Sequence, residues 1–373
     1  LHLCDRRQRQ MCIRDSYFSE YYTNPSSLYS SSRMVSKRVE EARKLIAGTI
    51  GAEASEIYFT SGGSESDNWA IKKIMISRMN KGKHMITTKV EHHAVLESCK
   101  YLESLGFEVT YLNVNEDGLI DLNELESSIR EDTILVSIMA ANNEIGTLMP
   151  LKEIGSICKK HKVLFHTDAV QAYGNIPIDV NEMNIDLLST SAHKIEGPKG
   201  IGFLYVRKGV MITPLICGGM QEKGKRAGTT NAPGIIGFAK ACELKFSEME
   251  KNNEYVLNLR EHLIDRVLSE IPYVRLNGSR DKRLVGNANF SFQFIEGEGM
   301  LLKLDALGIC ASSGSACTSG SLDPSHVLLA IGLPHEIAHG SLRLTMNHEN
   351  TMEEIDYTVD KLKEVISLSL IHI

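Results

Sequence analysis

The sequence predicts an α/β protein with a doubly wound, mostly parallel sheet of about seven strands and a smaller α+β C-terminal domain. Three observations lead to this prediction. Short apolar runs with strand character alternate with amphipathic helical stretches up to about residue 210. Polar clusters follow several of these runs, and strands and helices mix irregularly after about residue 270. The length of 373 residues fits about two domains.

The first domain is predicted over residues 17–249. A helix over 34–50 has Val39, Ala42 and Ile46 on one face, and Gly51 suits its C-terminal end. Strands and helices then alternate, as parallel strands joined by crossover helices require. The predicted strands are 56–60, 85–88, 107–112, 133–139, 163–167, 185–188 and 201–206, and the further helices are 64–79, 92–105, 121–129 and 151–161.

The second domain is predicted over residues 250–366. A long helical pattern over 231–270 leads into it from the first domain. The predicted strands that follow are 287–294 and 341–345, and the predicted helices are 299–307, 324–331 and 352–366.

The two ends of the chain look foreign to the rest. Residues 1–16 are rich in Arg, Gln and Cys, show no helical or strand period, and lack the apolar core of a signal peptide. Residues 367–373 break the pattern of the preceding helix. Both ends resemble translated sequencing-adapter reads, so we expect them to be non-native. Genomic DNA from an independent clone that reads continuously through these codons would refute this.

Composition excludes several classes of partner. The formal net charge of −6 gives no reason to expect nucleic acid or an anionic membrane surface. No apolar run approaches the roughly 20 residues that a membrane span needs. The eight cysteines are scattered without a CxxC pair, so neither a disulfide framework nor a zinc site is predicted. A reducing, cytoplasmic setting fits best.

The stretch 189–200 organises the chain. It places Ser191, His193 and Lys194 in a tight polar turn between two apolar runs. A lysine held there, with its pKa lowered by partial desolvation, can form a Schiff base with a carbonyl cofactor. Taken alone, a surface lysine beside a turn is the better interpretation.

Other polar clusters follow predicted strands in the same way: 61–64, 92–93, 142–143 and 168–171. Because ligands bind at the carboxyl ends of strands in doubly wound sheets, the clusters predict one site. The Gly62-Gly63 turn opens a helix, where backbone N–H groups favour an anion. The alternative there is an ordinary helix cap made by Ser64.

Two further residues suit a planar cofactor. Asp168 directly follows a strand, and its carboxylate could keep a pyridine nitrogen protonated so that the ring accepts electrons. The alternative is a helix-capping aspartate. His92 begins a helix, and its imidazole could stack on a ring or exchange protons. A capping or surface histidine is the alternative.

Cys317 lies in a Ser/Gly-rich stretch with almost no apolar anchors, which predicts a mobile loop and a reactive thiol. Cys310 lies in an apolar run and is predicted to be a core residue. Arg343 alternates with two leucines on a strand and could grip a carboxylate, unless it is simply solvated. Arg226 and Thr229 lie in a Gly/Lys-rich loop that could reach a phosphate, including that of a neighbouring subunit.

From about Tyr17 to Ile366 the chain resembles the cysteine desulfurases of the class V aminotransferase fold. The matching motifs are Ser-Ala-His-Lys-Ile-x-Gly-Pro-Lys-Gly-Ile-Gly, Val-Glu-His, His-x-Asp-Ala-x-Gln and Ser-Ser-Gly-Ser-Ala-Cys-Thr-Ser. The last motif is that of the long-loop subgroup, which includes nitrogen-fixation and housekeeping iron–sulfur assembly enzymes. The resemblance implies an aspartate-aminotransferase-like fold, a homodimer and pyridoxal 5′-phosphate as cofactor.

The resemblance also implies roles for individual residues. Lys194 would form the Schiff base, His92 would stack on the ring, and Asp168 would pair with the pyridine nitrogen. Arg343, and Asn143 with it, would bind the substrate carboxylate. The further cofactor-binding residues implied are Gly63, Ser64, Asn143, Gln171, Ser191, His193 and, from the partner subunit, Thr229.

The implied reaction begins when L-cysteine displaces Lys194, which then removes the α-proton. The thiolate of Cys317 attacks the substrate sulfur, leaving alanine and a persulfide that passes to an iron–sulfur scaffold or another acceptor. No resident metal is predicted, although Cys317 could be a transient iron–sulfur ligand.

The chain departs from the family pattern at three places. Residues 1–16 stand where relatives have Leu-Asp-Asn-Ala-Ala-Thr-Thr, 345–348 replace Ser-Leu-Gly-Arg, and a C-terminal scaffold-contacting tail is not found. We therefore expect weakened folding, substrate binding or scaffold binding.

Three rival hypotheses remain open. The first is a selenocysteine lyase or another lyase or transaminase of the same fold, which Cys317→Ser would distinguish. The second is a non-catalytic partner subunit, disfavoured because Lys194, Asp168 and Cys317 are all kept. The third, a nicotinamide-binding enzyme, lacks the GxGxxG motif.

Overall fold

The computed structural model describes residues 2–314 and 324–370, with side chains over 11–314 and 324–367. Two compact units divide the chain. The first comprises Leu1–Leu112, Leu122–Ala140 and Pro150–Glu248, and the second comprises Asn113–Asp121, Ala141–Met149 and the chain from Met249 onward. The segments 113–121 and 141–149, which the predicted domain 17–249 includes, therefore belong to the second unit.

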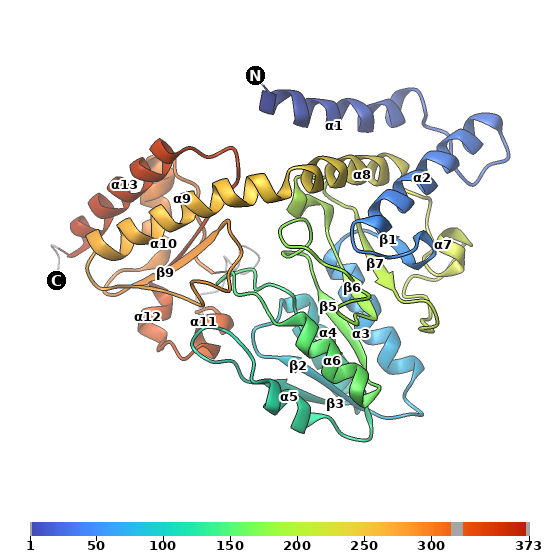
Figure 1. Cartoon of the computed structure of the whole chain (residues 1–373), viewed down its shortest axis with the longest axis horizontal. Coiled ribbons are helices and arrows are strands. Elements are labelled where there is room, and N and C mark those ends of the chain that lie inside the picture. The colour runs from blue at the N-terminus through green and yellow to red at the C-terminus, as the bar shows by residue number, and fades with distance from the viewer. Residues whose placement is uncertain (1, 315–323, 371–373) are drawn as a thin grey trace. The chain divides into compact units, whose positions relative to one another are not determined.

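A seven-stranded sheet forms the centre of the first unit (Figure 1). Its strand order is β1-β7-β6-β5-β4-β2-β3. Strand β7 is antiparallel to β1 and β6, and the remaining neighbours are parallel. The mostly parallel seven-stranded sheet is thus confirmed. Its strands are β1 (Ile57–Thr60), β2 (His84–Thr88), β3 (Glu108–Leu112), β4 (Thr133–Ser137), β5 (Leu164–Asp168), β6 (Leu187–Ser189) and β7 (Gly202–Val206).

Helices cover both faces of this sheet. The β2-to-β3 crossover moves along the sheet in the opposite direction to the crossovers that lead to β4 and β5. Right-handed connections then place their helices on opposite faces. The helices are α1 (His2–Ser19), α2 (Ser30–Gly48), α3 (Gly63–Ser77), α4 (His93–Ser104), α5 (Leu122–Ser128), α6 (Leu151–His161), α7 (Gln221–Gly224) and α8 (Ala232–Ser247), with short 3₁₀ turns η1 (Ala54–Glu56) and η2 (Ala192–Ile195).

Helix α3 anchors the apolar core beneath the sheet. Its buried face presents Trp69, Ile71 and Ile74 to β-strand side chains and to α4. The Trp69 indole N–H also donates to the Thr213 carbonyl at 2.8 Å. This packing fixes the N-terminal end of α3, which opens directly after β1.

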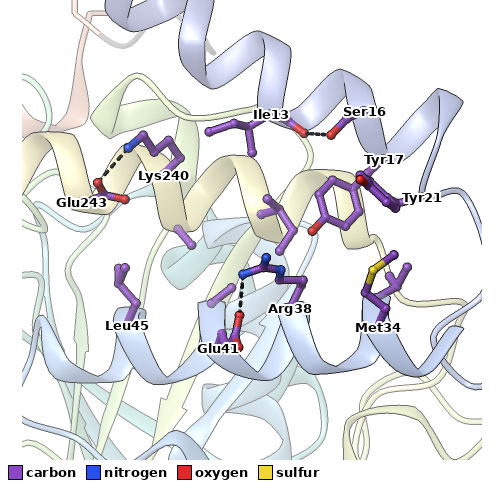
Figure 2. Close-up of a pocket in the computed structure, with 14 residues that line it drawn as sticks. Ile13, Ser16, Tyr17, Tyr21, Met34, Arg38, Glu41, Leu45, Lys240 and Glu243 are labelled. Carbon is purple, nitrogen blue, oxygen red and sulfur yellow. Dashed lines mark hydrogen bonds and ion pairs between the residues drawn. The ribbon is translucent and has the colours of Figure 1, made fainter. Parts of the chain in front are cut away.

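Helix α1 was not predicted. Residues 1–16 show no apolar period, yet they contain neither Gly nor Pro and are rich in good helix formers. Ile13, Tyr17 and Tyr21 line a cavity of about 430 Å³ between α1, α2 and α8, as Figure 2 shows. The ion pairs Arg38–Glu41 and Lys240–Glu243 lie at the same cavity. The non-native origin of residues 1–16 and 367–373 stays a prediction.

The second unit is built on a three-stranded antiparallel sheet in the order β10-β9-β8. Its core joins Phe290 and Phe292 of β9 to apolar side chains of α9, α10 and α13. The elements are α9 (Met249–Glu270), β8 (Val274–Leu276), β9 (Asn287–Phe292), α10 (Gly297–Ala306), α11 (His326–Ala330), α12 (His335–His339), β10 (Ser341–Thr345) and α13 (Met352–Leu370).

The sequence missed α7, β8 and α12, which are too short for a clear period. It also predicted one helical stretch over 231–270, which the structure divides into α8 and α9 at Glu248. None of the helices within residues 2–314 and 324–370 is long and apolar enough to cross a membrane.

The buried ion pair between Arg43 and Glu222 generates a stability prediction. Their side chains are only 7% and 8% exposed and form two hydrogen bonds, of 2.7 and 2.8 Å. Glu222→Ala should lower the free energy of unfolding by about 3–5 kcal/mol, because it removes the buried counter-charge of the Arg43 guanidinium and leaves only the more exposed Glu40, 3.1 Å from Arg43 Nε. Urea unfolding measures this.

The matched control is Glu41→Ala, which breaks the exposed Arg38–Glu41 pair. We expect a change below about 1 kcal/mol there. Equal, small losses in both variants would contradict the prediction.

Candidate active site

The parallel strands bring four of the five polar clusters to one edge of the sheet. Strands β1, β2, β5 and β6 run in the same direction, so the residues that follow them emerge together. These are the segments 61–64, 92–93, 168–171 and 191–194. The fifth cluster, 142–143, lies in the second unit and is described with it.

A glycine cradle opens helix α3. Gly62 has φ of 148°, and a Cβ there would lie 3.3 Å from Ser191 Oγ. A Cβ on Gly63 would lie 2.5 Å from a methyl group of Val170. The helix cap is Gly62, which offers no side-chain acceptor, so the alternative of a Ser64 cap is not found. The exposed Ser64 and the first-turn N–H groups can therefore serve an anion.

Ser191 and His193 extend this cradle. Ser191 is buried, and its hydroxyl lies 2.8 Å from Nδ1 of His193. Burial and the charges of Lys194 and Lys199 lower the pKa of His193, which favours the neutral ring. A neutral imidazole can donate one hydrogen bond to a bound anion.

Lys194 lies on the 3₁₀ turn η2 between β6 and β7. The residue is exposed, as expected for a surface lysine beside a turn, and the partial desolvation also considered from the sequence is not found. Its positive charge acts on Asp168, where it lowers the carboxyl pKa against the larger effect of burial. The charge of Lys194 therefore stabilises the ionised form of Asp168.

Asp168 ends β5 and is 6% exposed. Its Oδ1 accepts a hydrogen bond of 2.9 Å from the Val170 N–H. Burial raises its pKa to about 6. Ligand atoms of Asp168, His92 and Asp67 all lie within 4.8 Å of one another, a spacing that could also hold a cation. His92 Nδ1 accepts a hydrogen bond of 3.1 Å from the Ala94 N–H, so the alternative of a helix-capping histidine is also found. Because Nδ1 is an acceptor here, the proton of the neutral ring lies on Nε2.

Asp67 and Glu91 were not singled out from the sequence. Asp67 lies on α3 and is 1% exposed, and its Oδ1 has no hydrogen-bond partner among the described side chains and backbone. Burial and the neighbouring Asp168 raise its pKa well above the usual range. Glu91 is fully buried and accepts from Thr88 and from the Met139 N–H, and burial raises its pKa to about 8. Burial therefore favours the protonated form of both side chains, and Glu91 carries a proton at pH 7. An acid on the apolar face of α3 was the signal that could have revealed Asp67.

His166 lies deeper on β5. Its ring nitrogens lie 2.8 Å from Ser137 Oγ and 3.0 Å from Ser189 Oγ. Burial lowers its pKa to about 3, so it is neutral. Its Nε2 is 3.7 Å from Asp67 Oδ1. Neutral His166 and the two serine hydroxyls thus form a buried polar layer beside Asp67.

Three further residues of the first unit were predicted to bind the cofactor or its phosphate. Gln171 is half-buried just after Asp168, and Thr229 is exposed in the loop before α8. Arg226, which was expected to reach a phosphate, instead grips Glu65 with two hydrogen bonds of 2.9 and 3.0 Å. Because Glu65 follows Ser64 directly, this pair ties the loop to the first turn of α3.

In the second unit, Arg343 is half-buried on β10 and donates to the Asn143 carbonyl at 2.7 Å. Its side chain points away from the core that contains Leu342 and Leu344, as the alternation predicts. Cys317 lies outside the described residues. Cys310, predicted to be a core residue, is exposed, because it lies in the connection that leaves α10 rather than in an element.

Glu91 generates a prediction about pH. Its pKa rises from 4.5 unfolded to about 8 folded, so folding takes up a proton between these values. Its contribution to stability is complete below about pH 4.5 and is lost as pH rises towards 8. Glu91→Gln should therefore reduce the fall in unfolding free energy over this window by about 1.4 kcal/mol per pH unit.

Urea unfolding of the cofactor-free protein at several pH values between 5 and 8 measures this slope. The control is Glu97→Gln, which alters an exposed glutamate on α4. An unchanged slope in Glu91→Gln would mean that Glu91 is already ionised in the folded protein.

Comparisons with known proteins agree with this geometry. The family model for class-V aminotransferases matches residues 10–358. The curated cysteine desulfurase IscS of Methanosarcina thermophila is 55% identical over 350 residues, covering 94% of this chain and 86% of the relative. A solved NifS-like protein superposes with a TM-score of 0.91 at 38% identity, covering 96% of each chain.

A second solved structure, SspA in complex with cysteine, superposes with a TM-score of 0.80 at 38% identity, covering 91% of this chain and 94% of that one. The resemblance stated from the sequence is confirmed, and so is the aminotransferase-like fold. The chain belongs to the class-V aminotransferase family and, within it, to the cysteine desulfurases.

Proposed function

We propose that this enzyme uses pyridoxal 5′-phosphate to convert L-cysteine into L-alanine and a persulfide on Cys317. One observation supports this most strongly. The Gly62–Gly63 cradle, Lys194 and the buried carboxyl of Asp168 emerge at the same edge of one sheet. An anion site, an amine and a carboxylate in that arrangement suit a phosphorylated pyridine aldehyde.

The residues present fit the cofactor. The first-turn N–H groups of α3 and the pair Ser191–His193 would offer donors to a phosphate, and Gly62 and Gly63 permit the close packing of this turn against Ser191 and Val170. Lys194 would hold the cofactor covalently, and His92 would lie against its ring. Asp168 would face the ring nitrogen, Gln171 its hydroxyl, and Asn143 would lie beside it. Thr229 would complete the phosphate site from the partner subunit of a homodimer.

When bound, the cofactor supplies an electron sink for the substrate α-carbon. Lys194 accepts and returns the α-proton, which a flexible amine on a rigid turn can do. Arg343 binds the substrate carboxylate with its guanidinium, aided by Asn143. Because burial favours the protonated forms of Asp67 and Glu91, whereas the pKa of Asp168 is about 6, Asp168 would carry the negative charge of the buried acid group at pH 7.

Cys317 accepts the sulfur. Its thiolate attacks the substrate sulfur, the carbon–sulfur bond breaks and a sulfur–sulfur bond forms. The thiol proton is balanced by the proton that the product carbon gains, so cysteine and a thiol become alanine and a persulfide. An iron–sulfur scaffold or another thiol acceptor in the cytoplasm would then take the sulfur from Cys317.

The runner-up activity is that of a selenocysteine lyase or a transaminase of the same fold. The curated relatives named above favour the desulfurase. A transaminase needs no thiol, so Cys317 separates the two activities.

Cys317→Ser should abolish alanine release from L-cysteine, by at least about 100-fold, because no thiol accepts the sulfur. Alanine is measured with added cofactor and reductant. The matched control is Cys310→Ser, which alters an exposed cysteine nearby in the sequence and should retain activity. Equal activity in Cys317→Ser and the unaltered protein would reject a desulfurase that uses this thiol.

Asp168 predicts how cofactor affinity depends on pH. Below about pH 6 its carboxyl is protonated and cannot pair with the ring nitrogen. The unaltered protein should bind the cofactor more tightly than Asp168→Asn at pH 8, and the two affinities should converge by pH 5. Equilibrium dialysis measures both. A constant ratio across this range would contradict the role of Asp168.

A further inference from the structure

One buried carboxylate in the second unit meets both flanks of the segment that contains Cys317. The structure describes the chain up to Gly314 and again from Pro324. Glu144 is 1% exposed, and its Oε2 approaches both Gly314 and Ser325. The proposed function does not use Glu144, so its position needs a separate account.

The entry flank is fixed to β10. Ser312 and Arg343 exchange backbone hydrogen bonds of 3.2 and 2.6 Å, and the Ser312 hydroxyl donates to the Gly314 carbonyl at 3.3 Å. Gly314 has φ of 68°, and a Cβ there would lie 3.4 Å from Glu144 Oε2. The chain thus passes directly beside the carboxylate before residue 315.

The exit flank meets the same oxygen. Ser325 Oγ donates to Glu144 Oε2 at 2.5 Å. The same hydroxyl accepts from the Val327 and Leu328 N–H groups, so it also caps α11. A hydrogen bond to a carboxylate is short and strong, and here it holds the start of a helix.

Glu144 itself cannot shift easily. Its N–H donates to Asn142 Oδ1 at 2.9 Å. Its carbonyl accepts from the amide groups of Asn287 and Asn289 on β9, at 3.1 and 3.0 Å. These contacts join the carboxylate to the three-stranded sheet of the second unit.

The residue that precedes Glu144 is tied to the substrate arginine. The Asn143 carbonyl accepts from Arg343 Nη1 at 2.7 Å. Residue 143 therefore binds Arg343, and residue 144 binds Ser325 and lies beside Gly314. The geometry fixes the base of that segment relative to Arg343.

We propose that Glu144 is a positioning residue that, through Ser325 and Gly314, fixes both ends of the Cys317 segment relative to Arg343. The inference rests on the proposed function. A segment whose two ends meet at one point samples a smaller volume than one with a released end, which raises the effective concentration of its thiol. Releasing one end should therefore slow sulfur transfer without weakening substrate binding.

Ser325→Ala removes the donor to Glu144, and Ser325→Thr keeps a hydroxyl there. Ser325→Ala should lower kcat for alanine release by about 10-fold, with KM for cysteine and cofactor affinity unchanged. Ser325→Thr should restore most of the rate. The control is Ser269→Ala, which removes an exposed serine hydroxyl on α9 in the same unit. Unchanged kcat in Ser325→Ala, or a loss that appears only in KM, would overturn the inference.

The rate of Cys317 alkylation by iodoacetamide tests the anchoring without any activity assay, in protein whose Cys310 is replaced by serine. Ser325→Ala should react about threefold faster or more, and Ser325→Thr and Ser269→Ala should react at the unaltered rate. Equal rates in all four proteins would overturn the inference. Alkylation that changes as expected in a protein that releases no alanine would keep the anchoring and reject the proposed function instead.

Discussion

The burial of three carboxyl groups at one edge of the sheet is the constraint on which the candidate active site depends. Asp67, Glu91 and Asp168 share a dry region that could not hold three negative charges. Burial favours the protonated forms of Asp67 and Glu91, whereas Asp168, with a pKa of about 6, ionises near neutral pH. A cationic ring nitrogen would then meet one counter-charge, which is the most favourable balance for a buried ion pair.

The same constraint explains why the supporting layer is polar but uncharged. His166 is neutral, and serine hydroxyls from β4 and β6 satisfy both of its ring nitrogens. A charged lysine or arginine here would draw protons from Asp67 and Glu91 and multiply the negative charges. Lys194 acts from the exposed side instead, where it stabilises ionised Asp168. The supporting layer is therefore uncharged, and the positive charge that acts on Asp168 comes from the exposed Lys194.

The sequence predicted the sheet well because parallel strands and crossover helices have strong periods, and it predicted the segments that meet at the strand ends. It could not predict Asp67 or Glu144, since their importance depends on neighbours distant in the chain, such as Asp168 and Ser325. It missed α1 because a helix without an apolar stripe has no period. It did not predict the partner of Arg226, because the sequence near a glycine-rich turn is the same whether the arginine binds a phosphate or a carboxylate such as Glu65.

The two units solve different physical problems with the same device, a buried acid. In the first, burial favours protons on Asp67 and Glu91, so that Asp168 would be the carboxylate that acts on the proposed cofactor. In the second, the Glu144 carboxylate accepts a hydrogen bond from Ser325 and lies beside Gly314, and we propose that it fixes both ends of the Cys317 segment. A thiol that takes sulfur from one molecule and gives it to another must travel between them, yet must return to the same place each turnover. Under the proposal, fixed ends on the Cys317 segment meet the second requirement, because they restrict where the segment begins and ends.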